Sequence, residues 1–335
     1  MTAPHLLPRS AQGALRRFAR DHVDLQTNEV AAARRSRDYL IQQLQNGADE
    51  FPPFTGEVRH FGSFARRTKI RPLDDIDLMV VLEGQGLTLA HTNGQETHLR
   101  PAQAQWPANF LNPQGYLNSR VVLNSIRRHL VRVLVYRESP MKATGQALAL
   151  RLTTRPWTFD VVPAFAVTDL WTHEALHYLI PNGRGAWMPT DPRRDTLSLR
   201  EASQEVTGQL HSVIRLLKYW NRRGGKPRLG SYHLEVMAIE ALTVTPFVTA
   251  DPFDMLHACF VHISQRVLSL YPDPKGLEGP LDRTLTSEAR QAISAAAWHA
   301  GEAIHTVLKH PHVITVSLPA LRRVFGADVS PWSPI

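Results

Sequence analysis

Along its first half the chain alternates short apolar runs with polar connections, a pattern that predicts strands and helices in mixture. Apolar residues recur on one helical face over 12–46, and an Asn-Gly pair followed by Pro-Pro ends this helix. Residues 58–61 are predicted to form a short strand and 75–82, rich in branched apolar side chains, a longer one. The polar stretch 83–115 is predicted to be a long insertion or irregular connection.

Helical periodicity dominates the second half. Before it, the pattern predicts an amphipathic helix over 119–135, two strands over 147–153 and 157–162 joined by a turn, and a Gly-, Pro- and Arg-rich loop over 181–194. Helices are then predicted over 204–222, 233–244, 252–270 and 287–310. Because strands come first and helices afterwards, we expect two lobes, a mixed one over 1–195 and a mainly helical one over 196–335.

The composition limits the class of protein but does not determine its function. Of the 335 residues, 43% are hydrophobic and 20% charged, the values of an ordinary globular protein. The formal net charge of +8 favours acidic partners, among which nucleotides, nucleic acid and anionic lipid all qualify. The single cysteine, Cys259, excludes an internal disulfide framework and a thiolate zinc site, which fits a reducing compartment.

The sequence predicts a cytoplasmic protein with no membrane partner. Residues 1–8 lack the basic segment and the long apolar segment of a signal peptide. No apolar run approaches the roughly 20 residues that are needed to span a bilayer.

The least ordinary feature is a pair of carboxylates on an apolar run. Asp75 and Asp77 are separated by one residue, and on a strand such positions point to the same face. Ile76 and Leu78 would then point the other way, into a core. Like charges held that close repel each other unless a cation lies between them. The alternative pair of Asp74 and Asp77 would not share a strand face. The pattern therefore predicts a metal site.

Asp160 provides a third carboxylate, again on a predicted strand between apolar residues. Three carboxylates suit nucleotidyl transfer, in which two divalent ions about 4 Å apart stabilise the attacking and the leaving oxygen. Two Mg²⁺ ions are the predicted cofactors, because Mg²⁺ prefers carboxylate and phosphate oxygens, and Mn²⁺ is an alternative.

Gly62 and Ser63 follow the first predicted strand, and a glycine there lets the backbone approach a phosphate closely. Taken singly, each of these features has an ordinary structural explanation. A Gly-Ser dipeptide is common, an isolated Asp-x-Asp is usually a solvated turn, and a lone aspartate is usually a cap or an ion-pair partner. Along the chain the turn comes first, then the paired aspartates and then the later aspartate. This order favours a catalytic site over the separate structural roles.

This ordered set resembles the signature of the polymerase-beta-like nucleotidyltransferase superfamily. Within it, the chain is similar to the cGAS/DncV-like nucleotidyltransferases of bacterial anti-phage signalling, also called CD-NTases. The similar stretches run in family order at 62–70, 160–165, 187–192, 217–221 and 230–235. The resemblance implies an α+β fold, with a catalytic lobe of mixed sheet and flanking helices against a mainly helical lobe. The zinc thumb of the animal DNA sensor is excluded, because it needs more cysteines.

The resemblance also implies roles for individual residues. Gly62 and Ser63 would hold the triphosphate of the donor nucleotide, Lys218 would reach it as a point charge, and Ser231 would hydrogen-bond the phosphates. Tyr232 would stack on the donor base, although a core aromatic is an equal alternative for it. Asp75 and Asp77 would bind both metal ions, and Asp160 would complete the one beside the attacking hydroxyl.

The implied function is synthesis of a cyclic di- or trinucleotide messenger from NTPs (ATP, GTP or pyrimidine NTPs), in anti-phage defence. A regulatory protein or an RNA ligand would control it, and a downstream effector would read the product. One alternative is a nucleotidyltransferase with an RNA or oligonucleotide acceptor. A catalytically silent nucleotide-binding protein is another, and a toxin that modifies a protein is a weaker one.

Overall fold

A single mixed sheet forms the centre of the first lobe in the computed structural model, which describes residues 10–46, 52–93, 96–102, 106–206, 209–244, 250–277 and 279–330. Its strands are β1 (Phe54–His60), β2 (Asp75–Leu82), β3 (Thr88–Asn93), β4 (Glu96–Arg100), β5 (Met141–Thr144), β6 (Ala147–Arg151), β7 (Thr158–Thr168), β8 (Ala175–Pro181) and β9 (Trp187–Thr190). The order is β1-β2-β7-β8-β9-β4-β3, with β6 also pairing β7 and β5 pairing β6. Strands β2 and β7 are parallel, and the other pairs are antiparallel.

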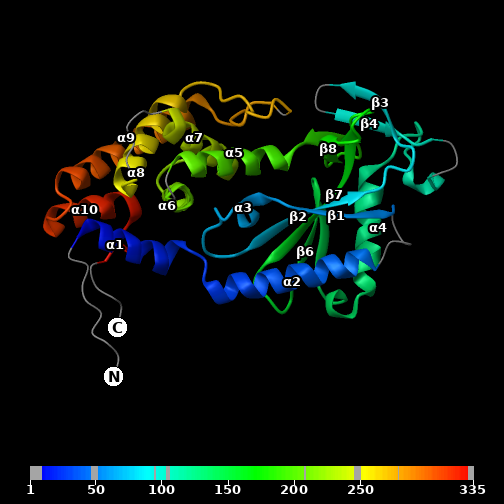
Figure 1. Ribbon diagram of the computed structural model, residues 1–335, viewed down its shortest axis with the longest axis horizontal. Helices are drawn as coiled ribbons and strands as arrows, with labels where there is room; N and C mark the ends of the chain where they lie inside the picture. The colour runs from blue at the N-terminus through cyan, green and yellow to red at the C-terminus, as the bar shows by residue number, and fades with distance from the viewer. Residues whose placement is uncertain are drawn as a thin grey trace.

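Most helices gather on one side of the molecule, away from the sheet (Figure 1). They are α1 (Ala11–Phe18), α5 (Pro192–Glu205), α6 (Leu210–Arg222), α7 (Ser231–Val244), α8 (Pro252–Arg266), α9 (Ser287–Lys309) and α10 (Ile314–Phe325). The helices that accompany the sheet are α2 (Thr27–Gln45), the short α3 (Gly62–Ala65) and α4 (Ser119–Arg132). Among the described residues, 3₁₀ turns lie at Ala108–Phe110 and Leu134–Tyr136.

The two faces of the sheet are covered unequally. Helices α2 and α4 bury one face through residues such as Leu40 and Ile126, which pack in one core with Ile76 and Leu78 of β2. The opposite face carries a smaller buried cluster that includes Met79. Since side chains alternate along a strand, Asp75 and Asp77 lie on this less covered face.

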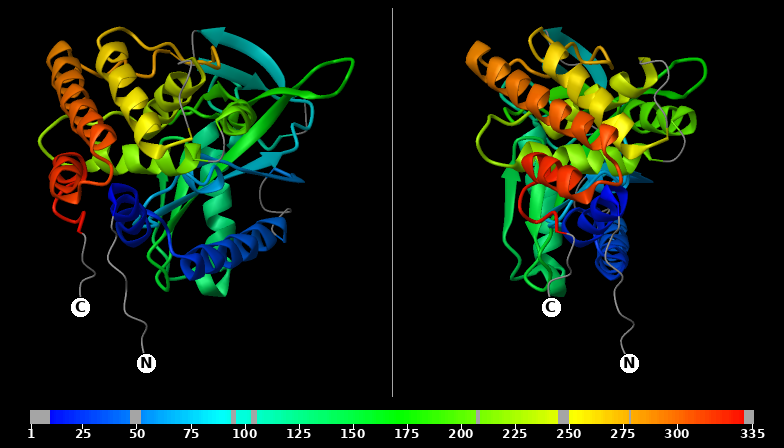
Figure 2. Two further views of the ribbon diagram at one scale, coloured as in Figure 1. Left: turned by 60° about the vertical axis from the view of Figure 1, so that its left-hand side comes forward. Right: turned by 90° about the vertical axis from the view of Figure 1, so that its left-hand side faces the viewer.

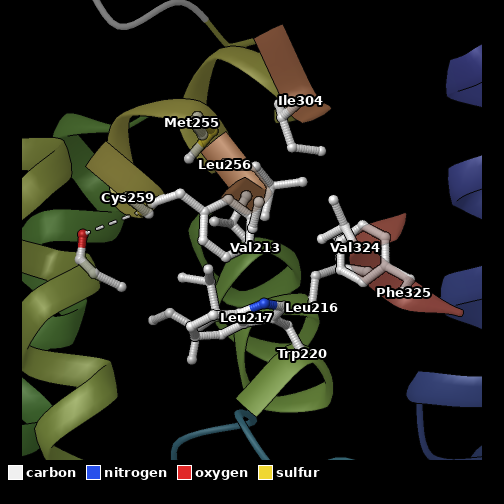
Figure 3. Close-up of a cluster of buried hydrophobic side chains, with 14 of the residues drawn as sticks. Val213, Leu216, Leu217, Trp220, Met255, Leu256, Cys259, Ile304, Val324 and Phe325 are labelled. Carbon is white, nitrogen blue, oxygen red and sulfur yellow. Dashed lines mark hydrogen bonds between the residues drawn. The ribbon is translucent and has the colours of Figure 1, made fainter. Parts of the chain in front are cut away.

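The helical lobe has its own core, in which α6 is central (Figure 3). Leu217 and Trp220 of α6 meet Leu256 of α8 and Phe325 of α10 there. Cys259 lies in this core fully buried, and burial raises the pKa of its thiol. A thiol in this environment has no access to solvent and acts as a small apolar side chain.

The prediction of one helix over 12–46 is wrong. Helix α1 continues as a π-helical turn, Ala19–Val23, and the chain becomes extended at Asp24 before α2 begins. The Arg71 side chain donates hydrogen bonds to the carbonyls of Arg20, Asp21 and Asp24, which satisfies the helix end. Consequently α1 packs beside α10 in the helical lobe, as Figures 1 and 2 show, whereas α2 covers the sheet.

Three further predictions need correction. The stretch 83–115 contains the hairpin β3–β4, whose strand β3 is exposed along its whole length and so lacks an apolar alternation. The predicted loop 181–194 includes strand β9 and the start of α5, which Asp191 caps by accepting a hydrogen bond from the Arg193 amide. The helix predicted over 204–222 is divided between the end of α5 and α6. Strands β5 and β8 and helix α10 were not predicted.

Other elements are confirmed. The strand over 75–82 is β2, the helix over 119–135 is α4 with a 3₁₀ turn, and the paired strands after it are β6 and β7. Strand β1 begins four residues before the predicted 58–61. Helices α7, α8 and α9 match the last three predicted helices, although α8 ends at Arg266.

Within the described ranges, no helix combines the length and the apolar character that crossing a membrane requires. Residues 1–8, where the sequence lacks a signal-peptide pattern, lie outside those ranges. The cytoplasmic location and the division of the chain at residue 195 stay predictions.

Stability should depend on pH through His233 in the helical lobe. This residue is 2% exposed, its ring centre lies 4.7 Å from that of Tyr271 with the two rings tilted, and burial lowers its pKa to about 4. The unfolded chain takes up a proton near pH 6.5, so the free energy of unfolding should fall as pH drops from 6.5 towards 4, by about 1–2 kcal/mol at pH 5.

Thermal unfolding at pH 7.5 and pH 5 tests this contribution. The His233→Phe variant, which keeps a ring but cannot take a proton, should lose less stability between the two values than the unmodified protein does. The matched control is His312→Gln, because His312 is exposed. An equal loss for all three proteins would contradict the assignment to His233.

Candidate active site

Strands β2 and β7 bring the predicted carboxylates together. The two strands run parallel, with Asp77 paired in register with Asp160 and Asp75 paired with Thr158. Parallel neighbours in register point their side chains to the same face of a sheet, so Asp77 and Asp160 lie side by side. The sequence alone did not predict this register.

The three carboxylates differ in how much positive charge lies near them. Burial, followed by the nearby charge of Asp160, raises the pKa of Asp77 to about 6. Burial likewise raises the pKa of Asp160, although the cation of Lys69 opposes this. The Lys69 ammonium, 7% exposed, contacts the carboxylates of Asp74 and Asp75. Asp75 therefore has a cationic partner within the protein, whereas Asp77 and Asp160 lie side by side as like charges.

No group of three or more His, Cys, Asp and Glu side chains in the described part of the chain is arranged to hold a metal ion. One of the three aspartates, Asp75, is in contact with the Lys69 ammonium. The donor set still fits a hard cation, since carboxylate oxygens are what Mg²⁺ prefers and a cation would offset the charges that raise the two pKa values. The metal-ligand role of Asp75, Asp77 and Asp160 stays a prediction.

The turn at Gly62 and Ser63 lies next to the carboxylate of Asp77. Gly62 begins α3 with a φ of 71°, and a Cβ atom on it would overlap the carboxylate of Asp77. Only glycine allows this backbone to lie so close to the aspartate. The Ser63 carbonyl accepts hydrogen bonds from the amides of Thr68 (2.9 Å) and Lys69 (3.0 Å), which closes the turn.

A cavity of about 240 Å³ lies where this turn, β2 and the helical lobe meet. Of the predicted site residues, it is lined by Ser63, Asp75, Asp77, Lys218, Ser231 and Tyr232. The first three come from the sheet lobe and the last three from α6 and α7. The cavity thus brings residues from both lobes to one place, and its lining includes both cations and carboxylates.

A larger cavity of about 690 Å³ shares Lys69 with the smaller one and has several arginines in its walls. None of the three predicted catalytic aspartates lines it. Asp75 and Asp77 line the smaller cavity instead, whereas Asp160 and Gly62 are in the lining of neither.

Lys218 and Tyr232 both have partners that the sequence did not predict. Lys218 is 5% exposed and contacts the carboxylate of Glu235 and the hydroxyl of Thr68. The Tyr232 hydroxyl donates to Asp195 at 2.6 Å, and burial and this bond raise its pKa. The Lys275 ammonium lies 4.4 Å from the centre of the Tyr232 ring. Base stacking on Tyr232 stays a prediction.

Sequence reasoning missed several residues of the cavity, among them Arg66 and Glu235. Each of these two stands four positions after a predicted ligand, Gly62 or Ser231, and that spacing places residues on one face of a helix. This spacing was the signal in the sequence that could have identified Arg66 and Glu235 as residues of the site. Their contact could not be seen from it, because 169 positions separate the two residues.

Comparison with known proteins identifies the family. No protein-family model matches the chain. Over 327 residues it is 34% identical to a probable cyclic nucleotide synthase of Bacillus cereus strain VD146, and the alignment covers 96% of this chain and 98% of that protein. The chain belongs to the cGAS/DncV-like nucleotidyltransferases. The sequence-based expectation of this family is confirmed, and the protein is a nucleotidyltransferase.

Solved structures of CD-NTases confirm the α+β fold. The structure of CdnC from E. coli MS115-1 with ATP matches with a TM-score of 0.68 at 17% identity and covers 98% of this chain and all of its own. CdnC has also been solved in a complex with HORMA-deltaN, with a TM-score of 0.69 at 18% identity and coverage of 95% and 97%. DncV from Vibrio cholerae matches with a TM-score of 0.69 at 13% identity and covers 96% of each chain.

Proposed function

We propose that this CD-NTase joins nucleoside triphosphates into a cyclic di- or trinucleotide second messenger in a Mg²⁺-dependent reaction. The observation that carries the proposal is the side-by-side placement of Asp77 and Asp160 on neighbouring strands, with Asp77 next to Gly62 and in the lining of a cavity that Lys218 and Ser231 also line. The name of the B. cereus relative, which aligns over nearly its whole length, supports a cyclic product.

In the proposed reaction, Ser63, Lys218 and Ser231 bind the triphosphate of the donor. The hydroxyl oxygen of a second nucleotide forms a bond to the donor α-phosphorus, and the bond to the β-phosphate breaks to release pyrophosphate. Asp160 accepts the hydroxyl proton on a carboxylate oxygen. Asp75, Asp77 and Asp160 would hold Mg²⁺, which would stabilise charge on the attacking and leaving oxygens. A further transfer between the joined nucleotides closes the ring.

The proposal also includes a biological setting. A cyclic messenger requires a downstream effector that reads it, and anti-phage signalling is the setting that the family resemblance implies. A regulatory protein is the proposed controller, because CdnC, which has a similar fold, has been solved in a complex with HORMA-deltaN. An RNA ligand is the alternative that the formal net charge of +8 favours.

Incubation of the purified protein with an equimolar mixture of the four NTPs tests the proposal. We expect mass spectrometry to detect a cyclic di- or trinucleotide and pyrophosphate with Mg²⁺, and neither with EDTA. The cyclic product should resist phosphatase, since it has no terminal phosphate. Mn²⁺ in place of Mg²⁺ should also support the reaction.

The basic net charge supports one rival, an enzyme that adds nucleotides to an RNA or oligonucleotide. Product formation that requires added RNA, with label entering that RNA, would favour this rival over the proposal. Absence of turnover in every NTP mixture, with and without RNA and a partner protein, would favour a catalytically silent nucleotide-binding protein.

A further inference from the structure

A buried carboxylate joins the two lobes at the cavity. The Glu235 side chain is 3% exposed, and it accepts hydrogen bonds from Arg66 Nε (2.9 Å) and the Thr68 hydroxyl (3.0 Å). It also contacts the Lys218 ammonium, which lies 3.2 Å from the same Thr68 hydroxyl. Arg66 and Thr68 follow the Gly-Ser turn of the sheet lobe, whereas Lys218 and Glu235 belong to the helical lobe. A single carboxylate is thus shared by donors from both sides of the cavity.

Glu235 is poorly suited to bind a nucleotide itself. It lines the cavity with Ser63 and Ser231, where a triphosphate is proposed to lie, and a carboxylate repels phosphate. A buried charge is also costly unless it is paired and hydrogen-bonded. The role of Glu235 at this position is therefore to hold the two cations, Arg66 and Lys218.

Those cations need a counter-charge. Arg66 and Lys218 are 8% and 6% exposed at the side chain, and without Glu235 they would be two like charges in a space with little water. Burial lowers the pKa of Lys218, and Glu235 opposes this, while Arg66 and Lys69 lower the pKa further. Glu235 therefore favours a charged Lys218, and the three groups together keep one net positive charge beside the cavity.

We propose that Glu235 is a positioning residue, which holds Lys218 and Arg66 from opposite lobes around the triphosphate site, and that Arg66 is a further phosphate-binding cation. The proposal rests on the proposed function, because it assumes that a triphosphate occupies this cavity. Helix α7 places Ser231 and Glu235 one turn apart on one face, so a phosphate contact and its support arise from the same element.

Steady-state kinetics of Glu235→Gln test the proposal. The variant keeps the size of the side chain and removes its charge. We expect kcat/KM for NTPs to fall on the order of 10- to 100-fold, with KM raised, because a misplaced supporting group displaces the ligand that it holds. The matched control is Glu240→Gln on the same helix, whose carboxylate contacts Tyr271 away from the cavity and whose kinetic constants should be unchanged.

The pH profile separates positioning from a structural role. In Glu235→Gln the alkaline limb of the pH–activity profile should shift to lower pH. The reason is that Lys218 loses its counter-charge and gives up its proton more readily. Adding Lys218→Arg should abolish this shift, since a guanidinium stays charged. Glu235→Asp keeps the charge on a shorter side chain, so it should lose activity with its alkaline limb unmoved. It also keeps the test open if Glu235→Gln does not fold.

The outcomes distinguish this proposal from the proposed function. If the unmodified protein makes no nucleotide product, the proposed function itself is wrong. If the unmodified protein is active and folded Glu235→Gln retains both its KM and its alkaline limb, Glu235 is not a positioning residue. Loss of stability in Glu235→Gln with unchanged kinetics below the melting temperature would likewise overturn the proposal.

Discussion

Replacing Asp77 with asparagine is expected to abolish nucleotidyl transfer while the protein stays folded. Asp77 lies at the centre of the site, paired in register with Asp160 and adjacent to Gly62. A carboxylate that helps to stabilise charge at phosphorus contributes several kcal/mol, and each 1.4 kcal/mol is about tenfold in rate. We therefore expect kcat/KM to fall about 10³-fold or more, as measured by pyrophosphate release from NTPs.

The same variant should be more stable than the unmodified protein in metal-free buffer at neutral pH. Since the carboxyl pKa of Asp77 is raised to about 6 in the folded state, folding favours the protonated form, and stability is lost as pH rises from about 4 to 6. Asparagine lacks this titration, so Asp77→Asn should gain about 1–3 kcal/mol at pH 7.5 and little at pH 4.5.

Asp74→Asn is the matched control. Asp74 is half-exposed and also contacts Lys69, but it lies outside the side-by-side pair of carboxylates. This variant should keep its activity and gain no stability at neutral pH. Full activity in Asp77→Asn, or equal loss in both variants, would contradict the assignment of Asp77.

The elements that the sequence predicted well are those in which local pattern and tertiary environment agree. Strand β2 is rich in branched apolar side chains and is buried from Leu78 onward, and only its two aspartates near the start interrupt the apolar run, so the strand was visible in the sequence. Strand β3 is exposed throughout and gave no such pattern. The break between α1 and α2 lacks Gly and Pro, and it depends on Arg71, which is distant in sequence, donating to the helix-end carbonyls.

For the site, sequence order identified the chemistry but not the contacts. The succession of Gly62-Ser63, Asp75, Asp77 and Asp160 predicted a nucleotidyltransferase, and family membership agrees. Which cation faces which carboxylate depends on how the lobes meet. Glu235 and its partner Arg66 were missed for that reason.

The conformation of the Gly-Ser turn leads to the second large effect, which is the loss expected from Gly62→Ala. A side chain at this φ of 71° is strained, at a cost of about 1–2 kcal/mol, because a left-handed backbone crowds a Cβ atom. The added methyl group would also overlap the Asp77 carboxylate. Either Asp77 or the turn must then move, and both are proposed to take part in the reaction.

Gly56→Ala separates these two costs. Gly56 has a similar φ of 87° in β1, but nothing lies within 4 Å of the position that a Cβ would take. It should show only the backbone strain, as a lower melting temperature with unchanged kcat/KM. Gly62→Ala should lose more stability and about 10²-fold in kcat/KM, because a displacement of about 1 Å at a reacting centre has effects of that size. If the two variants lose equal stability and Gly62→Ala remains active, the close approach of Gly62 to Asp77 does not matter for catalysis. The predicted contrast would show that glycine is needed at position 62 for the space it leaves to an aspartate.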